Sequence, residues 1–253
     1  PDSKLLVGNT MTEEMQTYLR TFENVEKVIV LNTNWYYFGH LDTTLAIVPT
    51  RKSPCGYVFA VASARLGIDL LRAVPQDELK GELVSVLQSL FKFRKICPEA
   101  FGKTDAVLGM KTFEQLALLY RQLHGFESKK GQKIIAACEE ADKRLNDIVR
   151  ELSQNSNVPI VRIPALYTDG PYGLVADLTP ALANMVVIDE DLIVPDGLLP
   201  AFTSHTSKVF QELGSKVHYL PSATFHNLRG QIHCATITLR DLDAKVRGDK
   251  PHK

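Results

Sequence analysis

Three residues of this sequence have side chains that could together carry out a covalent reaction on a cationic group. Cys234 offers a thiol that could attack as a nucleophile, and His40 could supply or remove protons. Asp42 offers a carboxylate, which suits a guanidinium because this planar cation forms bidentate hydrogen bonds with carboxylates. The reaction would be attack of the thiolate on the guanidinium carbon, loss of an amine, and hydrolysis of the covalent intermediate by water.

The segment around Cys234 combines a loop with a strand. Residues 225–230 are polar and basic and end in glycine, which predicts a loop, whereas residues 232–239 alternate with the period of a β-strand. Cys234 is therefore expected just inside a strand, where nearby basic side chains favour the thiolate over the thiol. Those side chains are Arg229, His218, His226 and His233. The alternative is a buried structural cysteine beside a basic loop.

His40 and Asp42 belong to a second informative stretch. Residues 39–49 alternate and predict a strand, on which side chains two residues apart share a face. The two side chains would then point the same way, about 6–7 Å apart along the strand, after a glycine that can open the backbone. Both could reach one small ligand. The alternative is a surface pair on an edge strand.

An aromatic cluster at residues 35–38 surrounds Trp35, the only tryptophan. It has two interpretations, which are core packing and an apolar wall of a ligand site.

Strands and helices alternate along the chain, which predicts an α/β or α+β fold. The predicted strands are 4–8, 26–31, 39–49, 56–63, 158–163, 184–188, 192–194, 216–220 and 232–239. The predicted helices are 10–23, 64–73, 75–95, 113–124, 133–152 and 202–214. A long loop is expected at 167–180, and 100–112 is ambiguous. The order strand, strand, helix, strand recurs loosely at 26–80 and 184–238.

Composition suits a globular protein with one large or two small domains, since the 253 residues are 45% hydrophobic and 23% charged. A formal net charge of zero does not favour nucleic acid or an anionic membrane as a partner, and no apolar run is long enough to span a membrane. The four cysteines are scattered singly, so neither a zinc site nor a disulfide framework is indicated. A reducing, cytoplasmic location is the expectation. The start at Pro1 suggests a processed or truncated chain.

Two motifs resemble those of the guanidine-modifying, or pentein, superfamily. Gly39-His40-Leu41-Asp42, followed by residues 45–49, resembles its His-x-Asp strand, and residues 230–236 resemble its nucleophile strand. Within the superfamily the sequence is most similar to the catalytic domain of protein-arginine deiminases. The supporting segments are 34–35, 138–152, 161–164, 184–187 and 226–240.

The resemblance implies a fold, an activity and a set of site residues. The fold would be an incomplete α/β propeller built of ββαβ units, with residues 1–253 forming the C-terminal portion of the catalytic domain. The activity would be hydrolysis of peptidyl-arginine to peptidyl-citrulline and ammonia. Cys234 would be the nucleophile, His40 the general acid and base, and Asp42 one of two guanidinium-binding aspartates. Trp35 and Arg229 are expected to contact the substrate.

The sequence also departs from this family. The family carries another catalytic aspartate, a substrate-binding arginine and calcium ligands upstream of the His-x-Asp strand, and residues 1–39 contain no equivalent motif. Calcium is therefore possible by resemblance, with ligands outside this chain. A second polypeptide that completes the propeller, or a homo-oligomer, is expected as partner, with an arginine-containing protein or peptide as substrate.

Two other functions remain open. A small-molecule guanidine deiminase of the agmatine or arginine type has similar Gly-His-x-Asp and His-Cys motifs. A non-catalytic binding or scaffold protein of the pentein fold would suit the missing aspartate.

Overall fold

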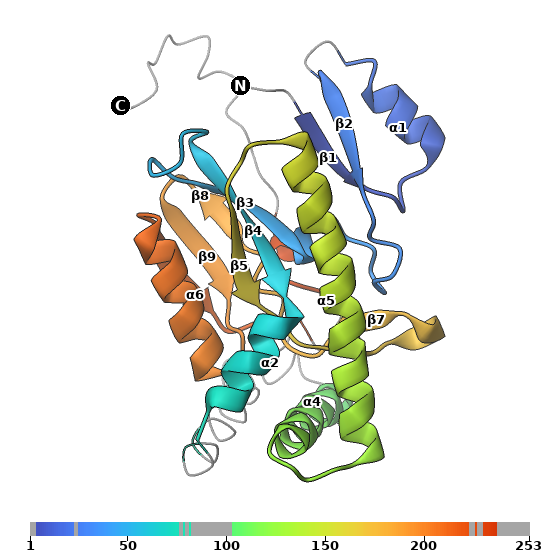
Figure 1. The fold of residues 1–253 in the computed structure, drawn as a ribbon, viewed down its shortest axis with the longest axis vertical. Coiled ribbons are helices and arrows are strands. Elements are labelled where there is room, and N and C mark those ends of the chain that lie inside the picture. The colour runs from blue at the N-terminus through green and yellow to red at the C-terminus, as the bar shows by residue number, and fades with distance from the viewer. Residues whose placement is uncertain are drawn as a thin grey trace.

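The structure is a computed structural model that describes residues 4–22, 25–75, 78, 81, 103–222, 226 and 230–236, with backbone alone for 103–110. Figure 1 shows its helices packed around small β-sheets, which confirms the predicted α/β class. Within these described ranges, none of the helices has the length and apolar character that a membrane span requires.

The elements follow one another as strands and helices in alternation. The strands are β1 (Lys4–Gly8), β2 (Lys27–Leu31), β3 (Leu45–Pro49), β4 (Tyr57–Ser63), β5 (Ile160–Pro164), β6 (Tyr167–Asp169), β7 (Val175–Asp177), β8 (Val186–Ile188), β9 (Asp191–Pro195) and β10 (Lys216–Leu220). The α-helices are α1 (Glu13–Leu19), α2 (Ala64–Ala73), α4 (Lys103–Leu123), α5 (Lys129–Asn155) and α6 (Pro200–Glu212). Short 3₁₀ turns are η1 (Leu41–Thr43), η3 (Pro171–Gly173) and η4 (His233–Ala235).

Two three-stranded sheets share one topology. In the first, β3 pairs antiparallel with β4, and β4 pairs parallel with β5. In the second, β8 pairs antiparallel with β9, and β9 pairs parallel with β10. Helix α2 follows β4 and helix α6 follows β9, so each sheet is a ββαβ unit. Among the described residues the strands form separate two- and three-stranded sheets, and closure of the units into a propeller stays a prediction.

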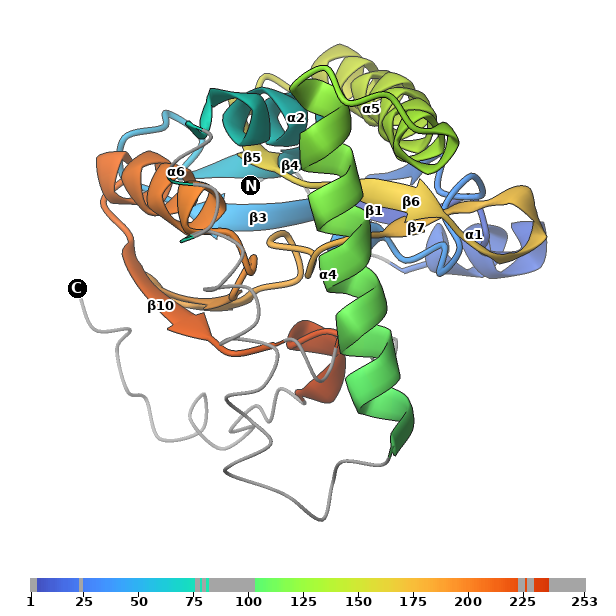
Figure 2. The same cartoon turned by 90° about the horizontal axis from the view of Figure 1, so that it is seen from below.

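The sequence predicted the wrong end for the first unit of the loose repeat. That unit was expected to end near residue 80, but its last strand is β5, because helices α4 and α5 are inserted between α2 and β5. Figure 2 shows α2 and α5 on the same side of the β3–β4–β5 sheet, with η4, in red, away from them.

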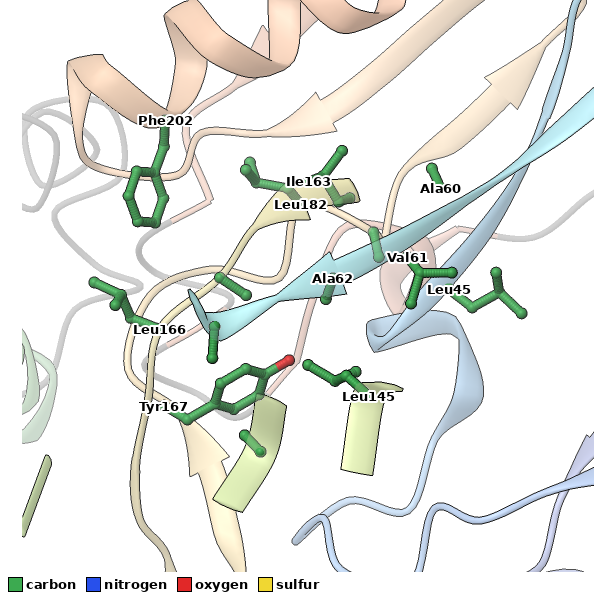
Figure 3. Close-up of a cluster of buried hydrophobic side chains, with 14 of the residues drawn as sticks. Leu45, Ala60, Val61, Ala62, Leu145, Ile163, Leu166, Tyr167, Leu182 and Phe202 are labelled. Atoms are coloured by element: carbon green, nitrogen blue, oxygen red, sulfur yellow. The ribbon is translucent and has the colours of Figure 1, made fainter. Parts of the chain in front are cut away.

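Helix α5 covers this sheet with one apolar face. Its buried side chains recur at intervals of three and four residues and include Ile134, Ala141, Leu145 and Leu152. Figure 3 shows Leu145 beside Tyr167 and the apolar side chains of β4 and β5. The helix predicted for 133–152 is therefore confirmed, and it is longer by about one turn at its start.

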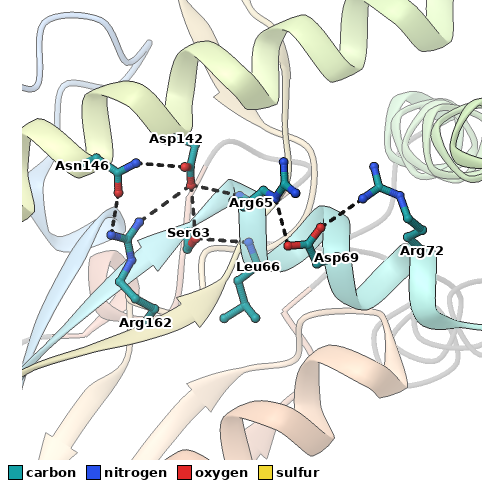
Figure 4. Close-up of polar contacts among 8 residues, drawn as sticks. All are labelled: Ser63, Arg65, Leu66, Asp69, Arg72, Asp142, Asn146 and Arg162. Atoms are coloured by element: carbon teal, nitrogen blue, oxygen red, sulfur yellow. Dashed lines mark hydrogen bonds and ion pairs between the residues drawn. The ribbon is translucent and has the colours of Figure 1, made fainter.

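A polar network ties α5 to the beginning of α2 and to β5 (Figure 4). The Asp142 carboxylate accepts hydrogen bonds from Ser63 Oγ at 3.2 Å and from the Arg65 backbone N–H at 2.9 Å. Asn146 Nδ2 donates a hydrogen bond to the second carboxylate oxygen of Asp142, Oδ2, at 3.0 Å. The Arg162 guanidinium lies 3.8 Å from Asp142 Oδ1. Because this single carboxylate contacts three elements, it fixes how α5 lies across the sheet.

Several predicted elements need correction. The loop expected at 167–180 contains the hairpin of β6 and β7, and the ambiguous stretch 100–112 contributes the first part of α4. The strand predicted for 39–49 is a strand only from Leu45, and residues 233–235 of the strand predicted for 232–239 form a 3₁₀ turn. Most of the helix predicted for 75–95 lies outside the described residues.

Candidate active site

The segment that carries Asp42 is a 3₁₀ turn, which is held in place by local hydrogen bonds. It follows Gly39, whose φ is +64°. A Cβ atom at this position would lie 2.7 Å from Thr10 Cγ2, so there is no room for a larger residue. Thr43 Oγ1 donates to the His40 carbonyl at 2.7 Å. The turn leads directly into β3, so Asp42 is positioned by the first strand of the sheet.

The predicted common strand face for His40 and Asp42 is wrong. A 3₁₀ turn has about three residues per turn, so side chains two positions apart do not share a side as they do on a strand. His40 is exposed, and its ring has no hydrogen bond or ion pair with any described residue. Asp42 is half-buried and points toward other partners.

Asp42 meets two side chains from distant parts of the chain. Its Oδ2 accepts a hydrogen bond from Asn184 Nδ2 at 2.9 Å and lies 2.9 Å from His233 Nδ1. Both contacts use the same oxygen, and within the described part of the chain Asp42 Oδ1 has no hydrogen-bond partner. This oxygen can therefore accept a hydrogen bond from a ligand.

Asn184 joins the carboxylate to the thiol. It is fully buried, two residues before β8, and its Oδ1 accepts a hydrogen bond from the His233 backbone N–H at 2.8 Å. The Cys234 Sγ lies 3.7 Å from Nδ2 and 3.9 Å from Oδ1 of the same amide. One buried amide thus contacts both Asp42 and Cys234, and it brings η1 and η4 together.

Asn184 is the member of this cluster that sequence reasoning did not single out as a site residue. The sequence signal that could have identified Asn184 is weak, because it consists of one amide side chain directly before the apolar residues 185–188. A buried polar side chain needs hydrogen-bond partners, and here those partners are the two candidate site residues.

Cys234 is exposed on η4, so the alternative of a buried structural cysteine is wrong for this residue. The turn is closed by a hydrogen bond from the Ala235 N–H to the Gln231 carbonyl at 3.2 Å. Cys138 is the buried structural cysteine, and burial raises the pKa of its thiol to about 12. Exposure leaves Cys234 Sγ open to a substrate.

The basic surroundings expected for Cys234 are only partly present. His233 is paired with Asp42, and His218 Nε2 lies 2.7 Å from Asp191 Oδ1 on the neighbouring strand β9. Burial lowers the pKa of His226 to about 4, so this imidazole is neutral at pH 7. Arg229 lies outside the described residues.

Trp35 lies in the aromatic core. It is 7% exposed, its Nε1 donates to the Asn32 carbonyl at 2.9 Å, and its ring contacts Tyr36 and Tyr167. The core-packing interpretation of the cluster is therefore confirmed for this residue. Little indole surface is left for a substrate, so the structure does not support the predicted substrate contact.

The described residues do not form a site for calcium. No group of three or more His, Cys, Asp or Glu side chains among them is arranged to hold a metal ion. Calcium prefers six or more oxygen ligands, so these residues are given no role in calcium binding.

Comparison with known proteins shows which family the chain matches. A family model described as protein-arginine deiminase matches residues 2–245. Human protein-arginine deiminase type-1 is 26% identical over 242 residues, and the mouse protein is 24% identical over 239 residues. Each match covers 90% of this chain but 31% of the relative, so the chain spans about a third of their length.

Solved structures give a more distant likeness. An agmatine deiminase from C. jejuni has a TM-score of 0.49 and 12% identity, with 92% of this chain and 51% of that chain covered. A variant of that enzyme with substrate bound gives the same values.

Proposed function

We propose, because the chain belongs to the protein-arginine deiminase family, that it takes part in hydrolysis of the guanidinium group of peptidyl-arginine. The products would be peptidyl-citrulline and ammonia. The observation that carries this proposal is the contact of one buried amide, Asn184, with both a carboxylate and an exposed thiol.

In the proposed reaction Asp42 holds the guanidinium and Cys234 attacks it. The free Oδ1 of Asp42 accepts a guanidinium N–H, which keeps the planar cation beside the thiolate. The Cys234 sulfur forms a bond to the guanidinium carbon. A protonated nitrogen then leaves as ammonia, and a covalent thiouronium intermediate remains.

Water completes the reaction in the second half. It attacks the same carbon and loses a proton to a general base, and the C–S bond breaks to release the ureido product and the thiolate. We assign the acid and base role to His40. Its exposed ring has no partner among the described residues, so a change of its χ angles can bring it to the bound substrate.

The contact between His233 and Asp42 has a further consequence for binding. The His233 imidazole occupies Oδ2 of Asp42. A guanidinium bound at this carboxylate is therefore expected to use Oδ1.

The test is a citrulline assay on an arginyl peptide, with agmatine and free arginine as parallel substrates. Each reaction is run with and without calcium. Cys234→Ala should abolish product formation, whereas Cys55→Ala, which removes another exposed thiol, should leave the rate unchanged. Asp42→Asn should raise KM and lower kcat/KM by at least about tenfold, because a charge-assisted hydrogen bond is lost.

The substrates separate the alternatives. Product from agmatine or arginine but not from the peptide would replace the proposal with a small-molecule guanidine deiminase. Absence of product from every substrate, also after addition of the remaining part of a full-length relative, would favour a non-catalytic protein of this family. A rate that survives in Cys234→Ala would refute the role of the thiolate.

A further inference from the structure

A cavity of about 370 Å³ lies between the β6–β7 hairpin, α4 and the aromatic segment 36–38. Its wall has an apolar part, which includes Tyr37, Phe38 and Ala176, and a polar part, which includes Thr168 and Gln115. Gln115 Nε2 donates to Thr168 Oγ1 at 2.8 Å, so these two groups already satisfy each other.

Asp177 is the charged group that burial affects most. It is the last residue of β7, and one of its oxygens, Oδ2, accepts a hydrogen bond from the Tyr36 hydroxyl. Loss of hydration raises the pKa of Asp177 to about 7, and the Tyr36 hydrogen bond acts in the opposite direction. No described Lys or Arg side chain lies within ion-pair distance of this carboxylate.

The other titratable groups on the wall favour a cation in the cavity. Asp169 carries a second carboxylate, and among the described lining residues Lys111 carries the one lasting positive charge. His226 also lines the cavity, but its lowered pKa of about 4 keeps it neutral near pH 7. Two carboxylates against one ammonium leave an excess of negative charge beside two aromatic rings, which attract cations by their π-faces.

We propose that this cavity binds a small organic cation, an alkylguanidinium or alkylammonium, with its charge on Asp177 and its stem against Phe38 and Tyr37. The site is separate from the thiol of Cys234, and the inference does not depend on the proposed function. A bound cation supplies a counterion that the described Lys and Arg residues do not provide. The size of the cavity suits a ligand of a few heavy atoms.

The site is connected to the turn that carries Asp42. Tyr36, which hydrogen-bonds Asp177, also forms a hydrogen bond with the side chain of Thr43 in η1. Thr43 in turn holds the His40 carbonyl.

The test is isothermal titration calorimetry of the full chain at pH 8 with butylguanidine, butylamine and butylurea. The Cys234→Ala variant is used, so that no reaction consumes a ligand. We expect the two cations to bind at the cavity, whereas neutral butylurea, which has the shape of butylguanidine without its charge, does not bind there. Asp177→Asn should weaken cation binding by at least about tenfold.

Two further variants locate the site. Asp147→Asn changes an exposed carboxylate on α5 and should leave the affinity within about twofold. Asp42→Asn removes the guanidinium contact proposed for the candidate active site, so the binding that remains in this variant reports on the cavity. A loss of binding in Asp42→Asn would mean that the cation sits at the candidate active site, and equal affinity in Asp177→Asn would also overturn the proposal.

If Asp177→Asn fails to fold, the proposal is tested by measuring cation affinity over a series of pH values in the protein that retains Asp177. Because the cation needs the ionised carboxylate, its affinity should fall about tenfold per pH unit below pH 7. An affinity that is independent of pH between 5 and 8, or equal binding of butylurea, would refute the site.

Discussion

The carboxylate of Asp42 accepts a hydrogen bond at 2.9 Å from the side-chain amide of Asn184, 142 positions later in the chain. The same amide lies beside Cys234 Sγ at 3.7 Å. Asn184 is fully buried, and its partners satisfy the amide on both of its ends. This residue therefore positions the candidate site, although it need not contact a substrate.

Replacement of Asn184 by alanine should destabilise the protein and separate the two halves of the site. The change leaves the His233 N–H without its side-chain acceptor and removes one donor from Asp42, which should lower the free energy of unfolding by about 1–3 kcal/mol. Urea denaturation measures this loss. Asn34→Ala, at an exposed position, should change it by less than about 0.5 kcal/mol, and an equal effect of the two variants would contradict the positioning role.

Asp177 should make stability fall as the pH rises. Its pKa is raised from 3.8 to about 7, so between these values the folded state binds more protons than the unfolded state. The free energy of unfolding should therefore decrease with pH in this window, by up to about 1.4 kcal/mol per pH unit from this group. Asp177→Asn removes this pH dependence. The stability of the variant relative to the unsubstituted chain should therefore increase between pH 5 and pH 7.

Denaturation of both chains at pH 5 and pH 7 checks this prediction. The expected gain of Asp177→Asn over that interval is about 2 kcal/mol. Asp147→Asn serves as control, because its carboxylate is on the exposed surface of α5. A stability difference that stays constant with pH would show that Asp177 titrates normally.

The cysteines should differ strongly in reactivity toward iodoacetamide. Cys138 is buried, its Sγ contacts the Tyr167 backbone N–H and carbonyl at 3.3 Å each, and its pKa is about 12. At pH 8 its thiolate fraction is about a thousandfold lower than that of an ordinary thiol. Peptide mass spectrometry should therefore find Cys234 and Cys55, which are exposed, alkylated in the native protein, and Cys138 only after unfolding. Early alkylation of Cys138 would contradict the packing of α5 against β6.

Asp142 should contribute more to stability than its neighbours on α5. Alanine at this position would leave the Arg65 N–H and the Ser63 hydroxyl without their acceptor and Arg162 without its nearest carboxylate, at a cost of about 2–3 kcal/mol. Asp147→Ala removes only an exposed pair with Arg150 and should cost less than about 0.5 kcal/mol. Thermal or urea denaturation of the two variants compares them directly, and similar losses would show that the network is unimportant.

Local patterns predicted the regular elements well where the pattern was long or its end was marked. The apolar spacing along 133–152 indicated helix α5, and the boundaries of α2 at residues 64 and 73 match the prediction. Prediction was wrong at 39–44 and 233–235, where alternation over a few residues coincides with 3₁₀ turns. Short alternating runs are weak signals, because tertiary contacts such as those of Asn184 can outweigh the preference of a few residues for a strand.

By itself, the sequence determined which elements form, which reactive groups are present and, through its two motifs, the family to which the chain belongs. Only the tertiary structure decided that Asn184 links Asp42 to Cys234, that Trp35 is buried in the core, and that Asp177 faces a cavity. The physical reason is the range of the interactions. Periodicity depends on neighbours within a few residues, whereas the partners and hydration of a side chain depend on segments that folding brings from far along the chain.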